Sequence, residues 1–164
     1  MRNTIGILVF LLIVTQASGQ YYTRDAGVRA GEGFFLTYRQ FFHENMAVEG
    51  MVGFSKNGFR LIGLREYFST LASARSDNLK LLYGYGIHAG VTYTNKYKFL
   101  NKVYYHDWMW TPQFGIDGAF GLEYSASEFP FLISAAIQPY FEFSLNRYFC
   151  LKPLNFIIAV KYRF

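Results

Sequence analysis

Large apolar side chains alternate with small or polar ones along several segments of this chain. The pattern is clearest over residues 79–93, where one parity holds Leu79, Leu81, Tyr83, Tyr85, Ile87, Ala89, Val91 and Tyr93, and the other holds Lys80, Leu82, Gly84, Gly86, His88, Gly90 and Thr92. Successive side chains of a strand point to opposite faces of the sheet. The segment is therefore predicted to be a β-strand with one apolar face and one small or polar face.

Seven other segments have the same character, and five of them show it more weakly. The two clearest are 112–124 and 155–164, and the others are 26–31, 34–42, 46–55, 59–68 and 131–143. Eight such strands predict an all-β fold, a single eight-stranded antiparallel transmembrane β-barrel. An even number of strands brings both termini to the same side, which is the periplasmic side in barrels of this kind.

The connections between these strands give further expectations. The longest, Lys96 to Thr111, is predicted to be an external loop, because such barrels have short periplasmic turns and longer external loops. Pro139 falls inside the segment 131–143, where a proline would remove a hydrogen bond from the ladder, so a bulge is expected there.

Charged residues concentrate on the parity that carries the glycines. Eleven lie on this predicted inner face, and Arg65 lies on the opposite one: Arg29, Arg39, Glu49, Arg60, Glu66, Lys80, Asp117, Glu123, Glu142, Lys161 and Arg163. Eight strands leave room for side chains only, so the charges are expected to pair inside the lumen, with Arg39 across from Glu49. A soluble lipocalin-like barrel has the reverse arrangement, because its apolar residues face inward.

Composition agrees with a membrane barrel. The chain of 164 residues is 52% hydrophobic and 21% aromatic but only 16% charged, which suits one domain that folds or inserts. Residues 1–19 read as a cleaved signal peptide and 20–164 as the barrel, since Arg2 precedes an apolar run and Ala17-Ser18-Gly19 forms a cleavage site. Removing them leaves a net charge of +4. That charge alone is compatible with nucleic acid, but an export signal argues against it.

The last strand carries apolar or aromatic residues at alternate positions back from the final phenylalanine: Phe156, Ile158, Val160, Tyr162 and Phe164. This pattern resembles the assembly signal of outer-membrane barrels. Together with Tyr38-Arg39, residues 47–54 and residues 115–124, it resembles the small eight-stranded outer-membrane β-barrel proteins of the Bacteroidetes type, with an OmpA/OmpX-like architecture. The resemblance implies a monomer in the Gram-negative outer membrane, inserted by the barrel assembly machinery, and it transfers no catalytic residue.

The segment 96–111 is the most suggestive functional feature, because it mixes cations with aromatic rings. The candidates for surface interaction are Lys96, Tyr97, Lys98, Lys102, Tyr104, Tyr105, Trp108 and Trp110. Cations and flat rings suit lipopolysaccharide phosphates, a polysaccharide or a protein partner. The alternative is anchoring in the membrane, because aromatic girdles mark both interfaces of such barrels.

Candidates for catalysis are few. His88 is predicted to point into the lumen as a hydrogen-bonding residue, since a His-x-Ser pair is interrupted by Gly90 two residues on. His106 and Asp107 are neighbours that seldom form a site unaided. The lone Cys150 allows no disulfide within the chain. The sequence therefore predicts a non-enzymatic barrel without metal or cofactor, in contact with outer-membrane lipid and lipopolysaccharide. A lipid-modifying enzyme of the acyltransferase or deacylase type and a narrow channel are the alternatives.

Overall fold

The computed structural model describes residues 23–55, 57–71, 78–99, 102–125, 129–144 and 148–164. These residues form one closed antiparallel β-barrel of eight strands, so the predicted fold class is confirmed. The ten strand segments are β1 (Arg24–Ala30), β2 (Gly33–His43), β3 (Met46–Ser55), β4 (Gly58–Thr70), β5 (Leu79–Phe99), β6 (Lys102–Ser125), β7 (Phe131–Ile137), β8 (Tyr140–Ser144), β9 (Tyr148–Lys152) and β10 (Phe156–Arg163). In this described part, no helix is long and apolar enough to cross a membrane.

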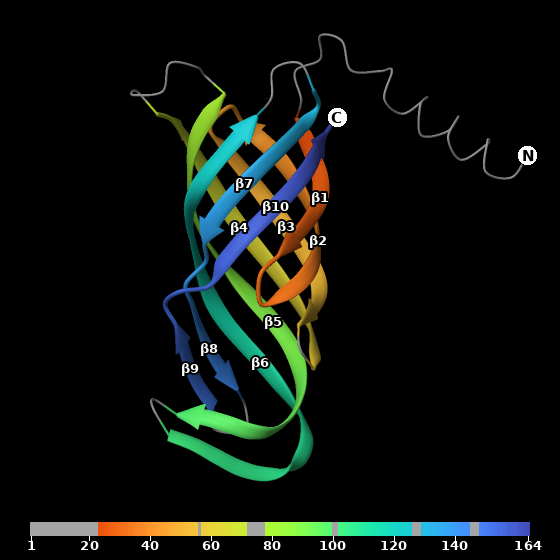
Figure 1. The fold of residues 1–164 in the computed structure, drawn as a ribbon, viewed down its shortest axis with the longest axis vertical. Coiled ribbons are helices and arrows are strands. Elements are labelled where there is room, and N and C mark those ends of the chain that lie inside the picture. Colours follow the sequence, from red (N-terminus) through yellow and green to blue (C-terminus); the bar gives the residue numbers. More distant parts are fainter. Residues whose placement is uncertain (1–22, 56, 72–77, 100–101, 126–128, 145–147) are drawn as a thin grey trace, which may run out of the picture.

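Strand β1 pairs with both β2 and β10, and this second pairing closes the barrel. The seam runs antiparallel from Asp25 opposite Arg163 to Ala30 opposite Ile158. Figure 1 shows that the C-terminus and the start of β1 lie at the same end, here called the terminal end. The opposite end is called the hairpin end, because the connection between β5 and β6 lies there.

The hairpin end is built by fewer strands. Beyond the short hairpins of β1 to β4, the long strands β5 and β6 continue together with β8 and β9 (Figure 1). Strand β8 pairs with β6 and β9 pairs with β8, while Phe99 of β5 stands parallel to Phe149 of β9. This last pairing curls the tip of the β5–β6 hairpin back toward β9. The barrel of eight strands thus continues into a four-stranded extension.

The prediction that residues 96–111 form an irregular loop is wrong. Strand β5 runs on to Phe99 and β6 begins at Lys102, with the two paired from Lys96 opposite Tyr105 to the tip. One register shift lies between Thr94 and Lys96. The mixture of cations and aromatic residues indicated a loop, although Lys96, Tyr97, Lys98 and Phe99 do alternate between polar and aromatic side chains as in a strand. The segment is a β-hairpin rather than an irregular loop.

The bulge expected at Pro139 is wrong, because the register with β6 is unchanged from Ile137 opposite Phe120 to Tyr140 opposite Asp117. The ladder of the predicted strand 131–143 breaks between β7 and β8, and both parts pair with β6. The backbone N–H of Gly118 donates to the Pro139 carbonyl at 2.8 Å, which keeps the chain tied to β6 at the break. Proline is tolerated here because its position in the ladder is interrupted.

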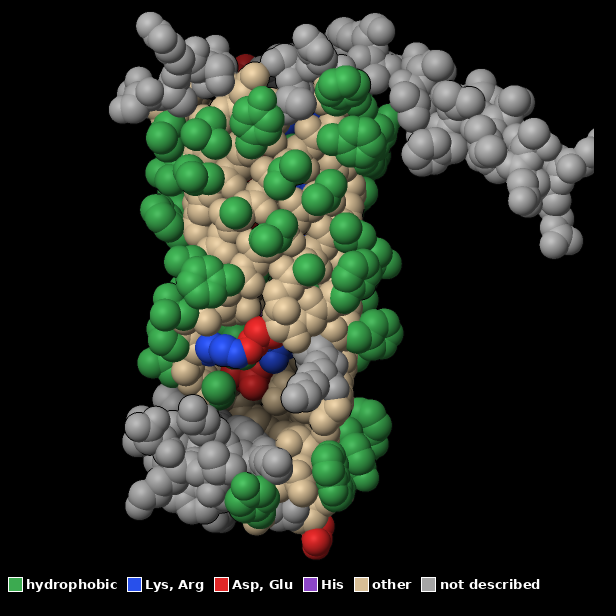
Figure 2. Space-filling model, in the orientation of Figure 1, with side chains coloured by type: hydrophobic (Ala, Val, Ile, Leu, Met, Phe, Trp, Pro, Cys, Tyr) green, Lys and Arg blue, Asp and Glu red, His purple; other side chains and the backbone are tan. Residues whose placement is uncertain are grey.

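Side chains alternate between the two faces as the sequence predicts. Large apolar residues stand exposed on the outside, for instance Leu36, Ile87, Phe114 and Ile158. Figure 2 shows these apolar side chains spread over the wall of the barrel. The small apolar core of the interior includes Phe35, Met51, Ile62, Leu64, Phe68 and Leu82. The rest of the interior is polar, which is the reverse of a soluble barrel.

Candidate functional site

The terminal half of the lumen is organised around Arg39 of β2, whose side chain is fully buried. Its guanidinium donates to Asp25 at 2.7 and 2.8 Å, to Glu123 at 2.8 and 3.0 Å, and to Glu66 at 3.2 Å. The rings of Phe41 and Phe68 lie 4.9 Å from the guanidinium carbon. Arg39 thus joins carboxylates of β1, β4 and β6 across the lumen. Bidentate charge-assisted contacts of this kind are among the stronger polar contacts.

A second group of charges surrounds Glu49 of β3. Lys161 of β10 lies 2.6 Å from one carboxylate oxygen, and Arg29 of β1 lies 3.6 Å from the other. The hydroxyl of Thr37 also donates to Glu49. Arg39 and Glu49 are register partners, as predicted. The carboxylates that contact Arg39 are instead those of Asp25, Glu66 and Glu123. The Glu49 group therefore ties the first strand and the last strand to β3.

Neutral Gln138 links this group to a third one. Its carbonyl oxygen accepts from Arg29 at 2.9 Å, and its amide nitrogen donates to Asp117 at 2.7 Å. The other Asp117 oxygen lies 2.6 Å from His88 Nδ1, and His88 Nε2 lies 3.3 Å from Glu142. Arg60 completes the group by donating to Glu142 at 2.6 Å. Both nitrogens of the buried imidazole thus face carboxylates.

Gly115 makes room for this histidine. A Cβ at that position would lie 2.4 and 2.6 Å from the His88 ring atoms Cε1 and Nε2, and 2.3 Å from the Phe141 carbonyl oxygen. A side chain there would move either the ring or the neighbouring strand. The glycine on the inner parity is therefore part of what positions His88.

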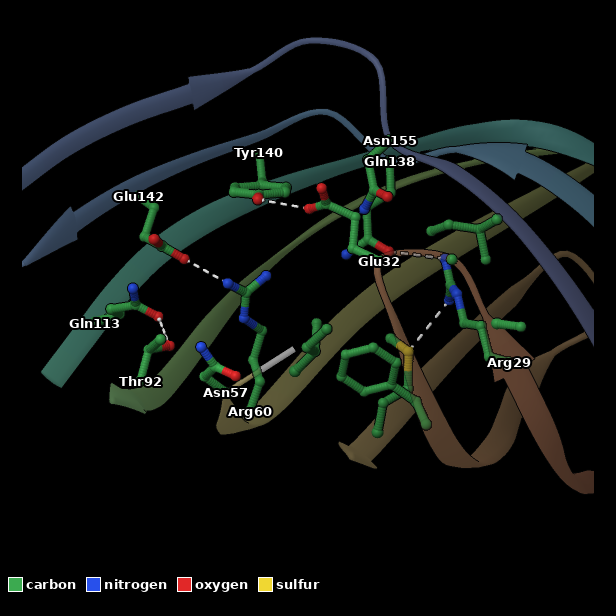
Figure 3. A pocket seen from close by; sticks show the side chains of 16 residues that line it. Arg29, Glu32, Asn57, Arg60, Thr92, Gln113, Gln138, Tyr140, Glu142 and Asn155 are labelled. Atoms are coloured by element: carbon green, nitrogen blue, oxygen red, sulfur yellow. Dashed lines mark hydrogen bonds and ion pairs between the residues drawn. The ribbon is translucent and has the colours of Figure 1, made fainter. Parts of the chain in front are cut away.

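A cavity of about 350 Å³ occupies the hairpin half of the lumen (Figure 3). Its lining combines two arginines, two carboxylates, several amides and apolar side chains. The lining residues are Arg29, Ala30, Gly31, Glu32, Phe35, Met51, Asn57, Arg60, Ile62, Thr92, Gln113, Gln138, Tyr140, Glu142, Asn155 and Ile157. In Figure 3 the labelled polar side chains extend toward the cavity from strands on several sides. The volume is in the range of small-molecule sites.

One side of the cavity opens where the β1–β2 turn faces β8 and β9. Glu32 of the turn accepts from the Tyr140 hydroxyl at 2.7 Å and forms an ion pair with Lys152 of β9. These three residues are called the mouth of the cavity. The Glu32 and Lys152 side chains are 33% and 40% exposed, so water reaches the mouth. Figure 2 shows a cluster of charged side chains beside a hollow in the lower part of the molecule.

The structure places the predicted lumen charges in two ways. Eight of them are buried: Arg29, Arg39, Glu49, Glu66, Asp117, Glu123, Glu142 and Lys161. The other three are half-buried: Arg60, Lys80 and Arg163. Lys80 and Arg163 stand at the terminal end, opposite Glu123 and Asp25 in their ladders. Arg65, predicted to face outward, is exposed.

Sequence reasoning missed Asp25, which is fully buried against Arg39. The first strand was predicted to begin at residue 26, although the observed β1 begins at Arg24. Asp25 shares its parity with Gly27 and Arg29, so extending the alternation by one residue pair would have found it. The bridging role of Gln138 left no sign in the sequence, because it depends on the break before β8.

The predicted interaction residues belong to the β5–β6 hairpin. Tyr105, Trp108 and Trp110 are exposed there, and the Tyr93 ring lies 5.2 Å from both Trp rings. The side chains of Lys96, Tyr97, Lys98, Lys102 and Tyr104 lie outside the described residues, as do that of His106 and the predicted signal peptide. Of the predicted assembly residues, Phe156, Ile158 and Val160 are exposed on the outer face of β10, Phe164 is exposed directly after it, and Tyr162 is half-buried.

Among the described residues, no group of three or more His, Cys, Asp or Glu side chains is arranged to hold a metal ion. Cys150 is half-buried and forms no disulfide.

No family model and no curated protein matches the chain. Among solved structures, it is similar to the crystal structure of the N-terminal β-barrel domain of Pseudomonas aeruginosa OprF, with a TM-score of 0.50 and 12% sequence identity. The match covers 86% of this chain and 95% of that one. At such low identity the likeness concerns the fold alone. By its closed sheet and by this likeness, the chain has the fold of a small eight-stranded β-barrel.

Proposed function

We propose that this protein is an integral barrel of a Gram-negative outer membrane, exported behind the signal peptide 1–19, with its terminal end in the periplasm and its β5–β6 hairpin outside. The observation that carries the proposal is the reversal of the two faces. Apolar side chains stand on the outer wall, while Arg39, Glu49 and Lys161 are buried inside. Hydrocarbon around the barrel makes this arrangement favourable, whereas water around it would not.

Cell fractionation and gel mobility test this proposal together. The protein is expected in the outer-membrane fraction, and detergent extracts should migrate differently before and after boiling, because a folded barrel remains compact in detergent. Recovery in the soluble periplasmic fraction without a heat-dependent shift would reject it. Protease added to intact cells should cut the β5–β6 hairpin and spare an epitope inserted after residue 20, ahead of β1, which tests the orientation and leaves Phe164 at the C-terminus.

The terminal strand is proposed to serve as the assembly signal. The alternate residues Phe156, Ile158 and Val160 form an exposed apolar row that ends at Phe164. Replacing Phe164 with Ser should lower the amount of barrel in the membrane, whereas Phe129→Ser, at an exposed phenylalanine outside the strands, should leave it near the wild-type amount.

We further propose a non-enzymatic role in which the β5–β6 hairpin contacts a surface partner, with lipopolysaccharide as the first candidate. Exposed Trp108 and Trp110 supply flat contact area, and Lys96, Lys98 and Lys102 of the same hairpin supply cations that suit phosphate groups. Replacing the three lysines with Ser should weaken lipopolysaccharide binding by the purified barrel without changing its heat-dependent shift. Unchanged binding would reject the role of the hairpin cations.

The ionic network supports a barrel that does not conduct. Arg39 crosses the lumen at the terminal end and leaves its carboxylate partners at most 3% exposed. Planar bilayers that contain the folded protein should therefore show no discrete conductance steps, and steps in the wild-type protein would favour the channel.

The second alternative, a lipid-modifying enzyme, draws on the Asp117–His88 pair. In the described structure both nitrogens of His88 face carboxylates, so neither faces a hydroxyl that it would activate. Mass spectra of lipids from overexpressing cells should therefore match those of the empty-vector control. A changed acylation pattern that disappears in a His88→Gln variant would favour the enzyme.

A further inference from the structure

The cavity in the hairpin half is assigned no role by the fold or by the proposed surface contact. We propose that it binds a neutral polyhydroxylated ligand of the carbohydrate class. Its lining has three properties that together select such a ligand: balanced charge, unsatisfied donors and acceptors, and apolar side chains.

The charges around the cavity are balanced among themselves. Arg60 is paired with Glu142 at 2.6 Å, Arg29 lies 3.6 Å from Glu49, and Glu32 is paired with Lys152. A strongly charged ligand would have to compete with these pairs and leave a buried partner uncompensated, which is costly. The cavity therefore favours a ligand without net charge.

Two buried polar atoms of lining residues have no hydrogen-bond partner. One is a donor, Arg29 Nε, and the other is an acceptor, the Asn155 side-chain oxygen. Arg29 is only 5% exposed, so its remaining N–H has little access to bulk water. A hydroxyl group both donates and accepts, so a ligand rich in hydroxyls can satisfy both kinds of atom.

Uncharged polar groups extend this pattern along the cavity. Gln113 accepts from the Thr92 hydroxyl at 2.8 Å, and this contact holds the carbonyl side of its amide. The amide nitrogen of Gln113 is then free to donate to a ligand. Asn57, at the turn between β3 and β4, adds another amide to the lining. Fixed amides are suited to read the positions of several hydroxyls.

Apolar side chains from β2, β4 and β10 also line the cavity. Phe35, Ile62 and Ile157 line it and are buried in the barrel. A sugar ring has a face of C–H groups beside its rim of hydroxyls, so it can use both kinds of wall. A purely polar ligand would leave the apolar wall in contact with its polar groups, which is unfavourable.

The mouth gives the ligand a way in from the side of the barrel. Tyr140 and Lys152 stand opposite each other in the β8–β9 ladder, whereas Glu32 lies in the β1–β2 turn, which is paired with neither strand. The Glu32 side chain can therefore turn aside without breaking the sheet. In the proposed membrane orientation the mouth faces outward, where lipopolysaccharide sugars and free saccharides both occur. The source of the ligand therefore depends on the proposed orientation in the membrane. Its chemical class does not.

Ligand-observed saturation-transfer NMR on the full chain refolded in detergent tests the proposal. The probes are glucose, galactose, N-acetylglucosamine, maltotriose and the core oligosaccharide released from lipopolysaccharide. We expect transfer to at least one probe. Transfer to the core oligosaccharide alone would identify a lipopolysaccharide sugar as the source, and transfer to the simple sugars would identify free saccharide.

Two lining variants separate the cavity from other surfaces. Gln113→Leu and Thr92→Val each remove hydrogen-bonding groups from the lining, so binding should weaken roughly tenfold, about what the loss of one or two hydrogen bonds produces. The matched control is Gln40→Leu, which removes an amide near the terminal end and should leave binding unchanged. Each variant is first checked for the heat-dependent gel shift, and either lining variant alone suffices if the other does not fold.

No transfer to any probe would overturn the proposal and leave the cavity to water, as would transfer that both lining variants leave intact. These outcomes differ from a failure of the proposed outer-membrane role, which the heat-dependent shift and fractionation report independently.

Discussion

The two halves of the barrel treat buried charge differently. In the terminal half, Arg39 and its carboxylate partners are at most 3% exposed, and eight strands surround them. In the hairpin half, the exposed fraction of paired side chains rises to 11% at Arg60 and to 40% at Lys152. The same residue types thus form a buried ionic network at one end and a partly exposed lining at the other. The buried network of Arg39 with Asp25, Glu66 and Glu123 is called the terminal brace. What differs is how completely strands close the wall, rather than the chemistry of the side chains.

The largest expected effect comes from removing the centre of the terminal brace. Arg39→Met would leave Asp25, Glu66 and Glu123 buried without their shared cation, and breaking a buried ion pair costs about 3–5 kcal/mol. The free energy of unfolding, measured by urea titration of the protein refolded in detergent with Trp fluorescence as the signal, should fall by at least that much.

The control for this change is Arg24→Met, which alters an exposed arginine at the terminal end, on β1, that donates to Gln40 of β2. It should change the unfolding free energy by no more than about 0.5 kcal/mol. If both variants unfolded at the same urea concentration as the wild type, the terminal half would not depend on its ionic brace.

An intermediate effect is expected where the two halves meet. Gly115→Ala would press a Cβ against the His88 ring and the Phe141 carbonyl, and overpacking of this kind costs about 1–3 kcal/mol. Gly50→Ala is the matched control, because nothing lies within 4 Å of its new Cβ. Urea titration of the two variants compares them directly, and equal stability would show that the lumen around His88 is loosely packed.

The smallest effect is expected at the mouth. Glu32→Gln removes a partly exposed ion pair with Lys152, and such pairs contribute about 0–1 kcal/mol. A double-mutant cycle with Lys152→Gln should give a coupling free energy in that range. A coupling above about 2 kcal/mol would mean that the mouth is as rigid as the terminal half and would erase the contrast between them.

The alternation in the sequence was sufficient for the barrel and for which side chains point inward. It gave Arg39, Glu49 and Lys161 the inner face because parity is a local property of a strand. It did not predict which inward charges form ion pairs, since Arg39 contacts Glu123 across a sequence separation of 84 residues. Which inward charges meet depends on strand tilt and side-chain length, and neither is written in the alternation.

The hairpin half was harder to predict for another reason. Residues beyond Tyr93 continue as paired strands, but in the sequence the alternation of polar and aromatic residues there is confined to Lys96–Phe99, and no regular alternation follows over 102–110. A mixture of lysines and aromatic residues therefore looked like a loop. The cavity was invisible as well, because its lining combines the β1–β2 turn, the break at Gln138 and the start of β10.

The position of Arg39 also has a consequence for the order of folding. Its three carboxylate partners lie 14, 27 and 84 residues away along the chain, on β1, β4 and β6. A growing sheet that holds only β1 to β4 would carry two of these carboxylates and would still have an open edge and water inside. The full set of contacts forms only after β6 arrives, and contacts of such high sequence separation form late and slowly. The terminal brace therefore cannot guide early strand pairing. It stabilises the barrel only after the sheet has closed around it.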